Sequence, residues 1–161
     1  MSDVLCIYYS RTGNTKEAME EIGQRLDAEV VPITDAVERR GFRGWWRCGL
    51  DAMRLTLDPV SHFETERPLE DYRLVVIGTP VWAGRCSCVV RSFLQEFGKR
   101  LPAASFVVLR SSEGKFEEIY RQMDGYLSQP HKTAVSLRKG SVGYSFWQED
   151  FLHQTLAFLG R

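Results

Sequence analysis

Apolar residues in this chain occur in two patterns that alternate along its length. Short continuous apolar runs, of which "VLCIYY" at residues 4–9 is the first, are typical of strands buried on both faces of a parallel sheet. Between these runs, apolar residues recur every three or four positions, which predicts amphipathic helices. The predicted strands are residues 4–9, 29–33, 74–78, 105–109 and 133–137.

Local capping signals set the expected ends of these elements. Asn14 and Glu17 have the spacing of a capping box at the first helix, and Ser87 is the predicted N-cap of the helix after the third strand. Pro80 is expected to end the third strand, because proline has no N–H to donate to a sheet. Gly160 is expected to close the last helix. The apolar helix stripes are Ala18, Ile22 and Leu26; Val89, Phe93, Phe97 and Leu101; Phe116, Ile119, Tyr120, Met123 and Leu127; and Phe151, Leu152, Thr155, Leu156 and Leu159.

The alternation of strands and helices predicts an α/β fold in three layers, a five-stranded parallel sheet with helices on both faces and right-handed crossovers. We expect a single domain over residues 1–161. The long connection at residues 34–72 exceeds the usual loop length, so it is expected to contain a helix of its own. Within it, Trp46, Leu50, Met53 and Leu57 have helical spacing.

Composition narrows the class of protein without selecting a function. The chain is 43% hydrophobic and 26% charged, as in globular proteins rather than disordered ones. Its 21 basic and 21 acidic residues cancel, so no overall field attracts nucleic acid or an anionic membrane, and neither is an expected partner. The first residues have no basic region and only a short apolar run, from which we expect a cytoplasmic protein.

The first loop, "YSRTGNT", follows the first strand and leads into a helix. Free N–H groups and the helix dipole favour an anion at such a place, and hydroxyl and amide side chains add donors. The loop lacks the glycine patterns that bind triphosphates and dinucleotides, which favours one terminal phosphate. The alternative is that the loop merely caps the helix. The candidate phosphate ligands are Ser10, Arg11, Thr12, Gly13, Asn14 and Thr15.

Two further polar loops follow strands and are expected at the same edge of the sheet. In "TPVWAGR", at residues 79–85, an exposed Trp82 could stack on a flat ring, although a core tryptophan under the next helix is equally compatible. Gly84 could let a peptide change orientation. The third loop is "RSSEG", at residues 110–114.

Other chemically reactive residues are interpreted as structural. Cys86 and Cys88 could form a redox pair, but residues two apart at a helix start rarely meet disulfide geometry, and Cys6 is expected in the core. The three histidines lack metal-ligand spacing and are expected to face solvent. The basic segment at residues 39–54 is interpreted as a solvated helix face, with a docking patch for an acidic partner or a nicotinamide phosphate as the alternative.

The pattern of Ser10, Thr12, Gly13 and Thr15 resembles the phosphate loop of flavodoxins. The segments "VVIGTPVWAG" and "VRSFL" are similar to the third strand, flavin-flanking loop and following helix of that family. "GFRGWWRCGLDAMR" is similar to an insertion between the second and third strands found in one of its branches. The resemblance spans most of the chain and is weak after about Gly114.

This resemblance implies a flavodoxin-like fold with strand order 2-1-3-4-5 and noncovalent flavin mononucleotide (FMN). Residues 10–15 would hold the phosphate. The third loop has no covering tyrosine, and its nearest aromatic is Phe116. A single stacking residue, or help from Trp45 or Trp46, would then leave the flavin more exposed and its binding weaker. The residues that would flank the ring are Thr79, Pro80, Val81, Trp82, Ala83 and Gly84, and those approaching its pyrimidine side are Ser111, Ser112 and Glu113.

The function implied by the resemblance is one-electron transfer through the flavin semiquinone, with redox proteins or NAD(P)H as partners. Flavodoxin carriers are usually acidic and this chain is neutral, which weakens the carrier interpretation. The alternatives are an NAD(P)H-dependent FMN quinone reductase and a domain that has the fold without the cofactor. The expected assembly is a monomer or a homodimer.

Overall fold

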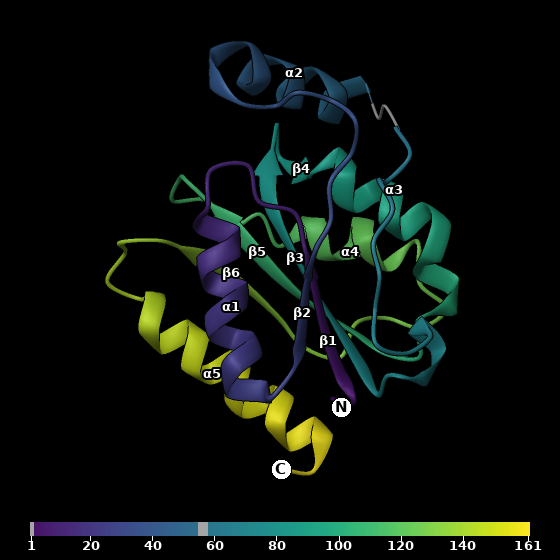
Figure 1. The fold of residues 1–161 in the computed structure, drawn as a ribbon. Helices are drawn as coiled ribbons and strands as arrows, with labels where there is room; N and C mark the ends of the chain where they lie inside the picture. Colours follow the sequence, from purple (N-terminus) through teal and green to yellow (C-terminus); the bar gives the residue numbers. More distant parts are fainter. Residues whose placement is uncertain (1, 55–57) are drawn as a thin grey trace.

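The computed structural model describes residues 2–54 and 58–161 and contains the predicted parallel sheet (Figure 1). Its five parallel strands lie in the order β2-β1-β3-β5-β6, which confirms the predicted order. Among the described residues, one short strand that was not predicted, β4, pairs antiparallel with β3. The strands are β1 (Val4–Tyr8), β2 (Glu29–Pro32), β3 (Leu74–Trp82), β4 (Arg85–Cys86), β5 (Ala104–Arg110) and β6 (Ala134–Arg138).

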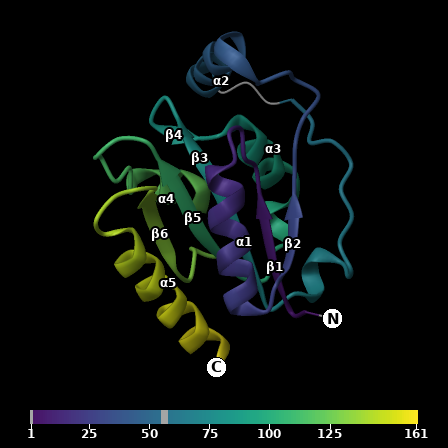
Figure 2. The same cartoon turned by 60° about the vertical axis from the view of Figure 1, so that its left-hand side comes forward.

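Helices cover both faces of this sheet (Figure 2). On one face the inward side chains of the central strands pack with those of α1 and α5, and on the other face they pack with those of α3 and α4. Alternation along β1 divides its residues, since Leu5 and Ile7 join one core while Val4 and Cys6 join the other. The helices are α1 (Asn14–Leu26), α2 (Gly41–Arg54), α3 (Cys88–Phe97), α4 (Glu118–Asp124) and α5 (Tyr144–Leu159), with short 3₁₀ turns η1 (Leu69–Asp71) and η2 (Gly98–Arg100).

The prediction that Pro80 ends the third strand is wrong. Strand β3 continues to Trp82, and Pro80 is paired with Leu109 of β5. The pairing of β1 with β3 stops at Tyr8 and Gly78, so the β1 side of β3 has no parallel neighbour beyond that point. A residue without an N–H can stand in such a half-paired stretch, where no ladder hydrogen bond is lost.

The capping signals are confirmed in part. The Ser87 hydroxyl accepts a hydrogen bond from the Val90 N–H at 3.1 Å, as an N-cap does, and Gly160 closes α5 with φ 75°. The capping box at Asn14 is wrong, because the N-cap of α1 is Gly13, with φ 105° and no side-chain cap. The loop thus enters the helix through a left-handed glycine, which leaves the first N–H groups of α1 without a capping side chain.

The long connection contains the expected helix, α2, but its apolar stripe is turned outward. Trp46, Leu50 and Met53 are exposed, and Leu57 lies outside the described residues. The buried residues of α2 are Gly44, Cys48, Asp51 and Ala52. In Figure 1, α2 lies across one end of the molecule, above the ends of the strands. Within the described ranges, no helix has the length and apolar character needed to cross a bilayer.

Candidate functional site

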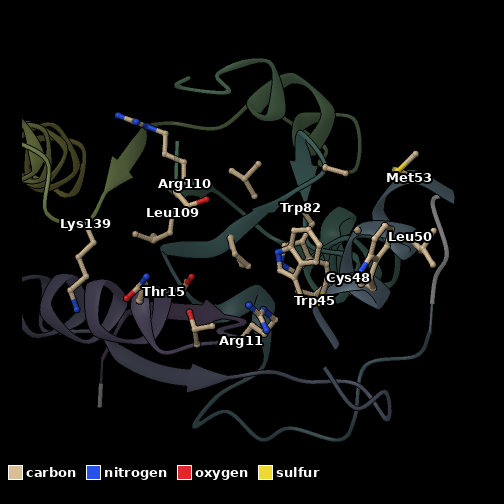
Figure 3. Close-up of a pocket in the computed structure, with 18 residues that line it drawn as sticks. Arg11, Thr15, Trp45, Cys48, Leu50, Met53, Trp82, Leu109, Arg110 and Lys139 are labelled. Atoms are coloured by element: carbon tan, nitrogen blue, oxygen red, sulfur yellow. The ribbon is translucent and has the colours of Figure 1, made fainter. Parts of the chain in front are cut away.

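A cavity of about 460 Å³ opens at the carboxyl edge of the sheet, below α2 (Figure 3). The three polar loops predicted from the sequence all contribute to its lining, and α2 forms a further wall. Its volume lies within the usual range for sites that hold a small molecule or cofactor. The order of the strands explains its place, since ligands of open parallel sheets bind beyond the carboxyl ends of the strands.

The first loop supplies the polar end of the cavity. Arg11, Thr12, Asn14 and Thr15 line it, and Thr15 is almost fully buried at the start of α1. Ser10 does not line the cavity; its hydroxyl accepts a hydrogen bond from the Gly13 N–H at 3.0 Å and so holds the loop in shape. The start of α1 therefore presents helix N–H groups and side-chain donors to the same space.

The second loop forms a β-hairpin rather than an open turn. Ala83 and Gly84 have φ values of 49° and 75°, which suits a two-residue connection between antiparallel strands. Residues 80–83 line the cavity, whereas Gly84 lies outside its lining. Thr79 also lies outside, because its buried hydroxyl accepts a hydrogen bond from the Ser87 N–H at 2.9 Å and so ties β3 to α3.

Trp82 lies in the cavity wall but is not the exposed ring of the stacking interpretation. Only 7% of it is accessible, and its ring meets Tyr9 edge-on at a centroid separation of 5.4 Å. The Arg39 guanidinium lies 5.0 Å from the Trp82 centroid. These two contacts fix the indole, so one of its faces is already occupied by a cation.

The third loop contributes fewer residues to the cavity lining than the resemblance implies. Ser111 lines the cavity, but Ser112 and Glu113 do not, and both are exposed. The adjacent Arg110 does line it, with its guanidinium donating to the Ser136 hydroxyl at 3.1 Å and to the Ser112 carbonyl at 2.6 Å. This pair of hydrogen bonds holds the Arg110 side chain at the rim of the cavity.

A buried ion cluster fastens α2 above the cavity. Arg39, whose side chain is 2% exposed, lies 2.8 Å from Asp35 and 3.0 Å from Asp51 of α2. Its guanidinium also lies 2.9 Å from the Cys88 sulfur and 3.8 Å from the Cys48 sulfur. Burial acts to lower the pKa of Arg39, but the hydrogen bonds that its guanidinium donates to Asp35 and the neighbouring negative charges outweigh burial, and the pKa is raised. The side chain therefore stays charged.

The interpretation of residues 39–54 as a solvated basic face is wrong for Arg39. Asp35 and Asp51 enclose this arginine under α2 instead of leaving it in water. Arg47 also pairs with Asp51, at 2.9 Å, and its side chain is half exposed. Arg43 and Arg54 do face solvent, as predicted.

The cysteines behave as buried thiols in the described chain. Burial raises the pKa of Cys86 to about 11 and that of Cys88 to about 12, despite nearby arginines that act to lower both. Cys6 lies in the core, as predicted, and burial raises its pKa to about 12. All four cysteines are free, so Cys86 and Cys88 form no disulfide.

The histidines follow the prediction except at one position. His62 and His153 are exposed, whereas His131 is half-buried, with Nδ1 3.0 Å from the Asp124 carboxylate. Its ring also packs on Phe106, with the ring centroids 5.1 Å apart. The sequence around His131 has no pattern that could have indicated this contact. No group of described residues is arranged to hold a metal ion.

The cavity is cationic and aromatic at the same time. Arg11, Arg110 and Lys139 line it, and the lining that the structure describes includes no carboxylate. Lys139 follows β6 and pairs with Glu17 of α1, which holds it near the start of that helix. Sequence reasoning placed Arg110 in the third loop without giving it a role at the ligand, and it missed Lys139. The position of Lys139 directly after a strand was the available signal.

Helix α2 supplies the other missed residues. Its contribution to the lining is Trp45, Trp46, Cys48, Gly49, Leu50 and Met53. The resemblance implied that Trp45 or Trp46 could help at the ring site, and Trp45 and Trp82 both line the cavity (Figure 3). From the sequence, Leu50 and Met53 were given helical spacing only, with no place at the cavity.

Comparisons with known proteins agree with this architecture. No protein-family model matches the chain, and no curated protein matches it in sequence. Among solved structures, it is similar to a flavoprotein from Lactobacillus acidophilus in complex with FMN, with 18% identity and a TM-score of 0.65 over 91% of this chain and 99% of that one.

Two other solved structures share the topology. A WrbA-like flavodoxin from Agrobacterium tumefaciens has 15% identity and a TM-score of 0.58, with all of both chains covered. An NADH:FMN oxidoreductase in its apo form has 12% identity and a TM-score of 0.56, over 96% of this chain and 89% of that one. Strand order, helix placement and these likenesses together establish that the chain has the flavodoxin-like fold.

Proposed function

We propose that this protein binds FMN without a covalent bond and transfers electrons one at a time between partner proteins. The observation that carries the proposal is a single cavity that joins a helix N-terminus with cationic side chains to a wall of aromatic rings. A phosphorylated compound with a flat ring system is complementary to both ends. The neighbour crystallised with FMN supports this choice of ligand.

The polar end fits one phosphate monoester. The N-cap Gly13 brings no side chain between the ligand and the first turn of α1, and Thr12 and Thr15 add hydroxyl donors. Arg11 and Lys139 supply positive charge, although Lys139 also pairs with Glu17, and the described lining itself contains no carboxylate. These residues would hold the phosphate by charge-assisted hydrogen bonds.

The aromatic end fits a flat, largely apolar ring. Trp82, held by Tyr9 and Arg39, provides a fixed wall, and Trp45 of α2 lines the same cavity. Val81 and Ala83, from the hairpin, complete the wall on the sheet side. These residues would orient the ring and exclude water from it, while the flavin supplies redox chemistry in one-electron or two-electron steps.

An NAD(P)H-dependent FMN reductase that acts on a quinone is the second candidate. It is favoured by the apolar outer rim of the cavity, where Leu50 and Met53 of α2 are exposed and could contact a second flat compound. The likeness to an NADH:FMN oxidoreductase supports it as well. Both functions need the same flavin site.

Spectroscopy separates these functions. The purified protein is expected to be yellow, and anaerobic photoreduction is expected to bleach it in two resolved stages if it is a carrier. Bleaching in one stage, with rapid oxidation of NADH or NADPH in the presence of a quinone, would identify the reductase. If calorimetry detects no FMN binding to the folded protein, the site belongs to a domain without the cofactor, and both proposals fail.

A further inference from the structure

Helix α2 has three distinct sides. One side, with Gly44, Cys48, Asp51 and Ala52, is buried against the body of the protein. A second side, which we call the aromatic face, is apolar although it faces solvent. Its residues and exposed fractions are Phe42 at 73%, Trp45 at 54%, Trp46 at 53%, Leu50 at 37% and Met53 at 67%.

The third side carries positive charge. Arg43, Arg47 and Arg54 lie four and seven positions apart, which places them in one row along a helix. We call this row the basic stripe. The acidic residue of α2, Asp51, is buried and lies 3.0 Å from Arg39. It also lies 2.9 Å from Arg47, which is 3.8 Å from Asp58 as well, so Arg43 and Arg54 supply most of the positive charge of the stripe.

The rings of the aromatic face form one cluster. Phe42 stacks on Trp45 with centroids 6.1 Å apart, and Trp45 meets Trp46 edge-on at 5.8 Å. Phe42, the most exposed of the three, lies outside the cavity lining, so a ligand in the cavity would not cover it. Phe42 therefore needs a partner other than the cavity ligand, and it continues the exposed surface of Trp45 and Trp46 beyond the cavity.

We propose that α2 docks the protein on the surface of an anionic lipid bilayer. A helix with aromatic and aliphatic residues on one side and arginines on the next lies in the plane of a bilayer interface, with its rings at headgroup depth. Arginines beside that face add electrostatic attraction to anionic lipids. Its 14 residues are too few to span the hydrocarbon core, so α2 would lie on the membrane.

The position of α2 permits this orientation. Figures 1 and 2 show the helix lying across one end of the molecule, beyond the strand ends, with the sheet behind it. Trp45, Trp46, Leu50 and Met53 belong both to the aromatic face and to the cavity lining. A docked protein would thus turn its cavity mouth toward the bilayer, where lipid-soluble compounds are concentrated.

Other occupants of the aromatic face agree less well with its composition. Antiparallel pairing of two α2 helices about a two-fold axis would place both basic stripes on the same flank, where they repel. A stable protein interface needs about 20–30 residues on each side, far more than the exposed part of one helix supplies. The proposal replaces the expectation of no membrane contact, which rested on the balanced charge of the whole chain.

The test mixes the protein of residues 1–161, loaded with FMN, with lipid vesicles and measures how much protein sediments with them. Binding is expected to vesicles of phosphatidylcholine and phosphatidylglycerol, to be much weaker to phosphatidylcholine alone, and to fall as salt is added. The double variant Phe42→Ser/Trp46→Ser is expected to bind at least about ten-fold more weakly. Arg43→Gln and Arg54→Gln are each expected to weaken binding about five-fold.

A matched control is present on another helix. Phe146 and Trp147 of α5 form an exposed aromatic pair, 65% and 38% accessible, so Phe146→Ser/Trp147→Ser should leave vesicle binding unchanged. Circular dichroism checks that each variant is folded, and Phe42→Ser alone serves if the double variant is not. Equal loss in the α5 control would overturn the proposal, as would absence of sedimentation with anionic vesicles.

Two further results would assign the aromatic face to another occupant and so also overturn the proposal. A dimer in sedimentation velocity that Phe42→Ser dissociates would identify a second copy of the chain. Saturable binding to an acidic polypeptide such as polyglutamate, without binding to vesicles, would identify an acidic protein. Neither result depends on FMN, so failure of the membrane-docking proposal can be distinguished from failure of the proposed function.

Discussion

Arg39 shows how one side chain can organise a site that it does not line. Its guanidinium lies against two carboxylates, two thiols and the Trp82 ring, and so joins α2 to the strands below it. Nothing in the local sequence separates Arg39 from Arg40, which is exposed and pairs with Glu38. The burial of one and the exposure of the other come from tertiary contacts alone.

Replacing Arg39 with methionine should lower the free energy of unfolding by about 3–5 kcal/mol, because Asp35 and Asp51 would remain buried without their shared cation. Urea unfolding monitored by circular dichroism measures the change. Arg40→Met is the control and should leave stability unaltered, since its ion pair is exposed to solvent. Equal loss in both variants would show that the buried cluster does not stabilise the fold.

Thr15 is buried at the start of α1 and belongs to the phosphate end of the cavity. Thr15→Val or Thr12→Ala should weaken FMN binding about ten-fold or more, because a hydrogen bond to a charged group is lost. Arg11→Ala should weaken it less, since the Arg11 guanidinium is partly engaged by the Arg39 carbonyl at 3.4 Å.

Riboflavin provides the matched ligand for this comparison, because it has the same ring without the phosphate. Isothermal calorimetry should find its affinity unchanged by Thr15→Val. If Thr15→Val weakens both ligands alike, or if Arg11→Ala has the largest effect on FMN, the first loop does not bind a phosphate as proposed.

The sequence predicted well the position of those helices and strands whose inner faces are purely apolar. The stripe of Ala18, Ile22 and Leu26 is buried as expected, and the parallel strands lie within a few residues of their predicted bounds. Strand β4 escaped prediction because two residues contain no periodicity. The orientation of α2 could not be predicted from apolar spacing, because its buried face consists of Gly44, Cys48, Asp51 and Ala52, which include a charge and small residues.

Two glycines in α2 test how this helix is seated. A Cβ on Gly44 would lie 2.0 Å from the Arg39 carbonyl carbon, so Gly44→Ala should lower the free energy of unfolding by about 1–3 kcal/mol. A Cβ on Gly49 would meet no atom within 4 Å, so Gly49→Ala should be neutral or stabilise the protein by up to about 1 kcal/mol. Thermal unfolding of the two variants measures both changes. The opposite order would mean that α2 does not sit on Arg39.

For the molecule as a whole, buried thiols make stability depend on alkaline pH. Burial raises the pKa of Cys86 to about 11 and those of Cys6 and Cys88 to about 12, above the usual value near 8.5. Above about pH 8.5 the unfolded chain therefore binds fewer protons than the folded one, and stability should fall as pH rises. Below that pH these thiols are protonated in both states and contribute no change.

Urea unfolding at neutral pH and at about pH 10 measures this dependence. Iodoacetamide at neutral pH gives an independent check, since the four buried cysteines should remain unmodified in the folded protein and react once it is unfolded. Rapid modification of Cys86 or Cys88 in the native state would contradict their assignment as inert.

The fold and the edge of the sheet that carries the cavity were predictable from the chain, because strand order and loop position follow general rules of parallel sheets. Thr12, Thr15 and Trp82, named from the sequence, do line the cavity, and their binding of a cofactor stays a prediction. The basic end was not found in full, since Lys139 comes from the loop after β6, remote in sequence from the first loop. Its place depends on how α1 and β6 are arranged in space.

The division of α2 into separate sides has a consequence for how this chain can diverge. The residues that anchor the helix, among them Gly44 and Asp51, are different from those that face outward, such as Phe42 and Arg43. Substitutions of Phe42 or Arg43, which neither anchor the helix nor line the cavity, would change the outer surface of α2 without altering how the helix is seated.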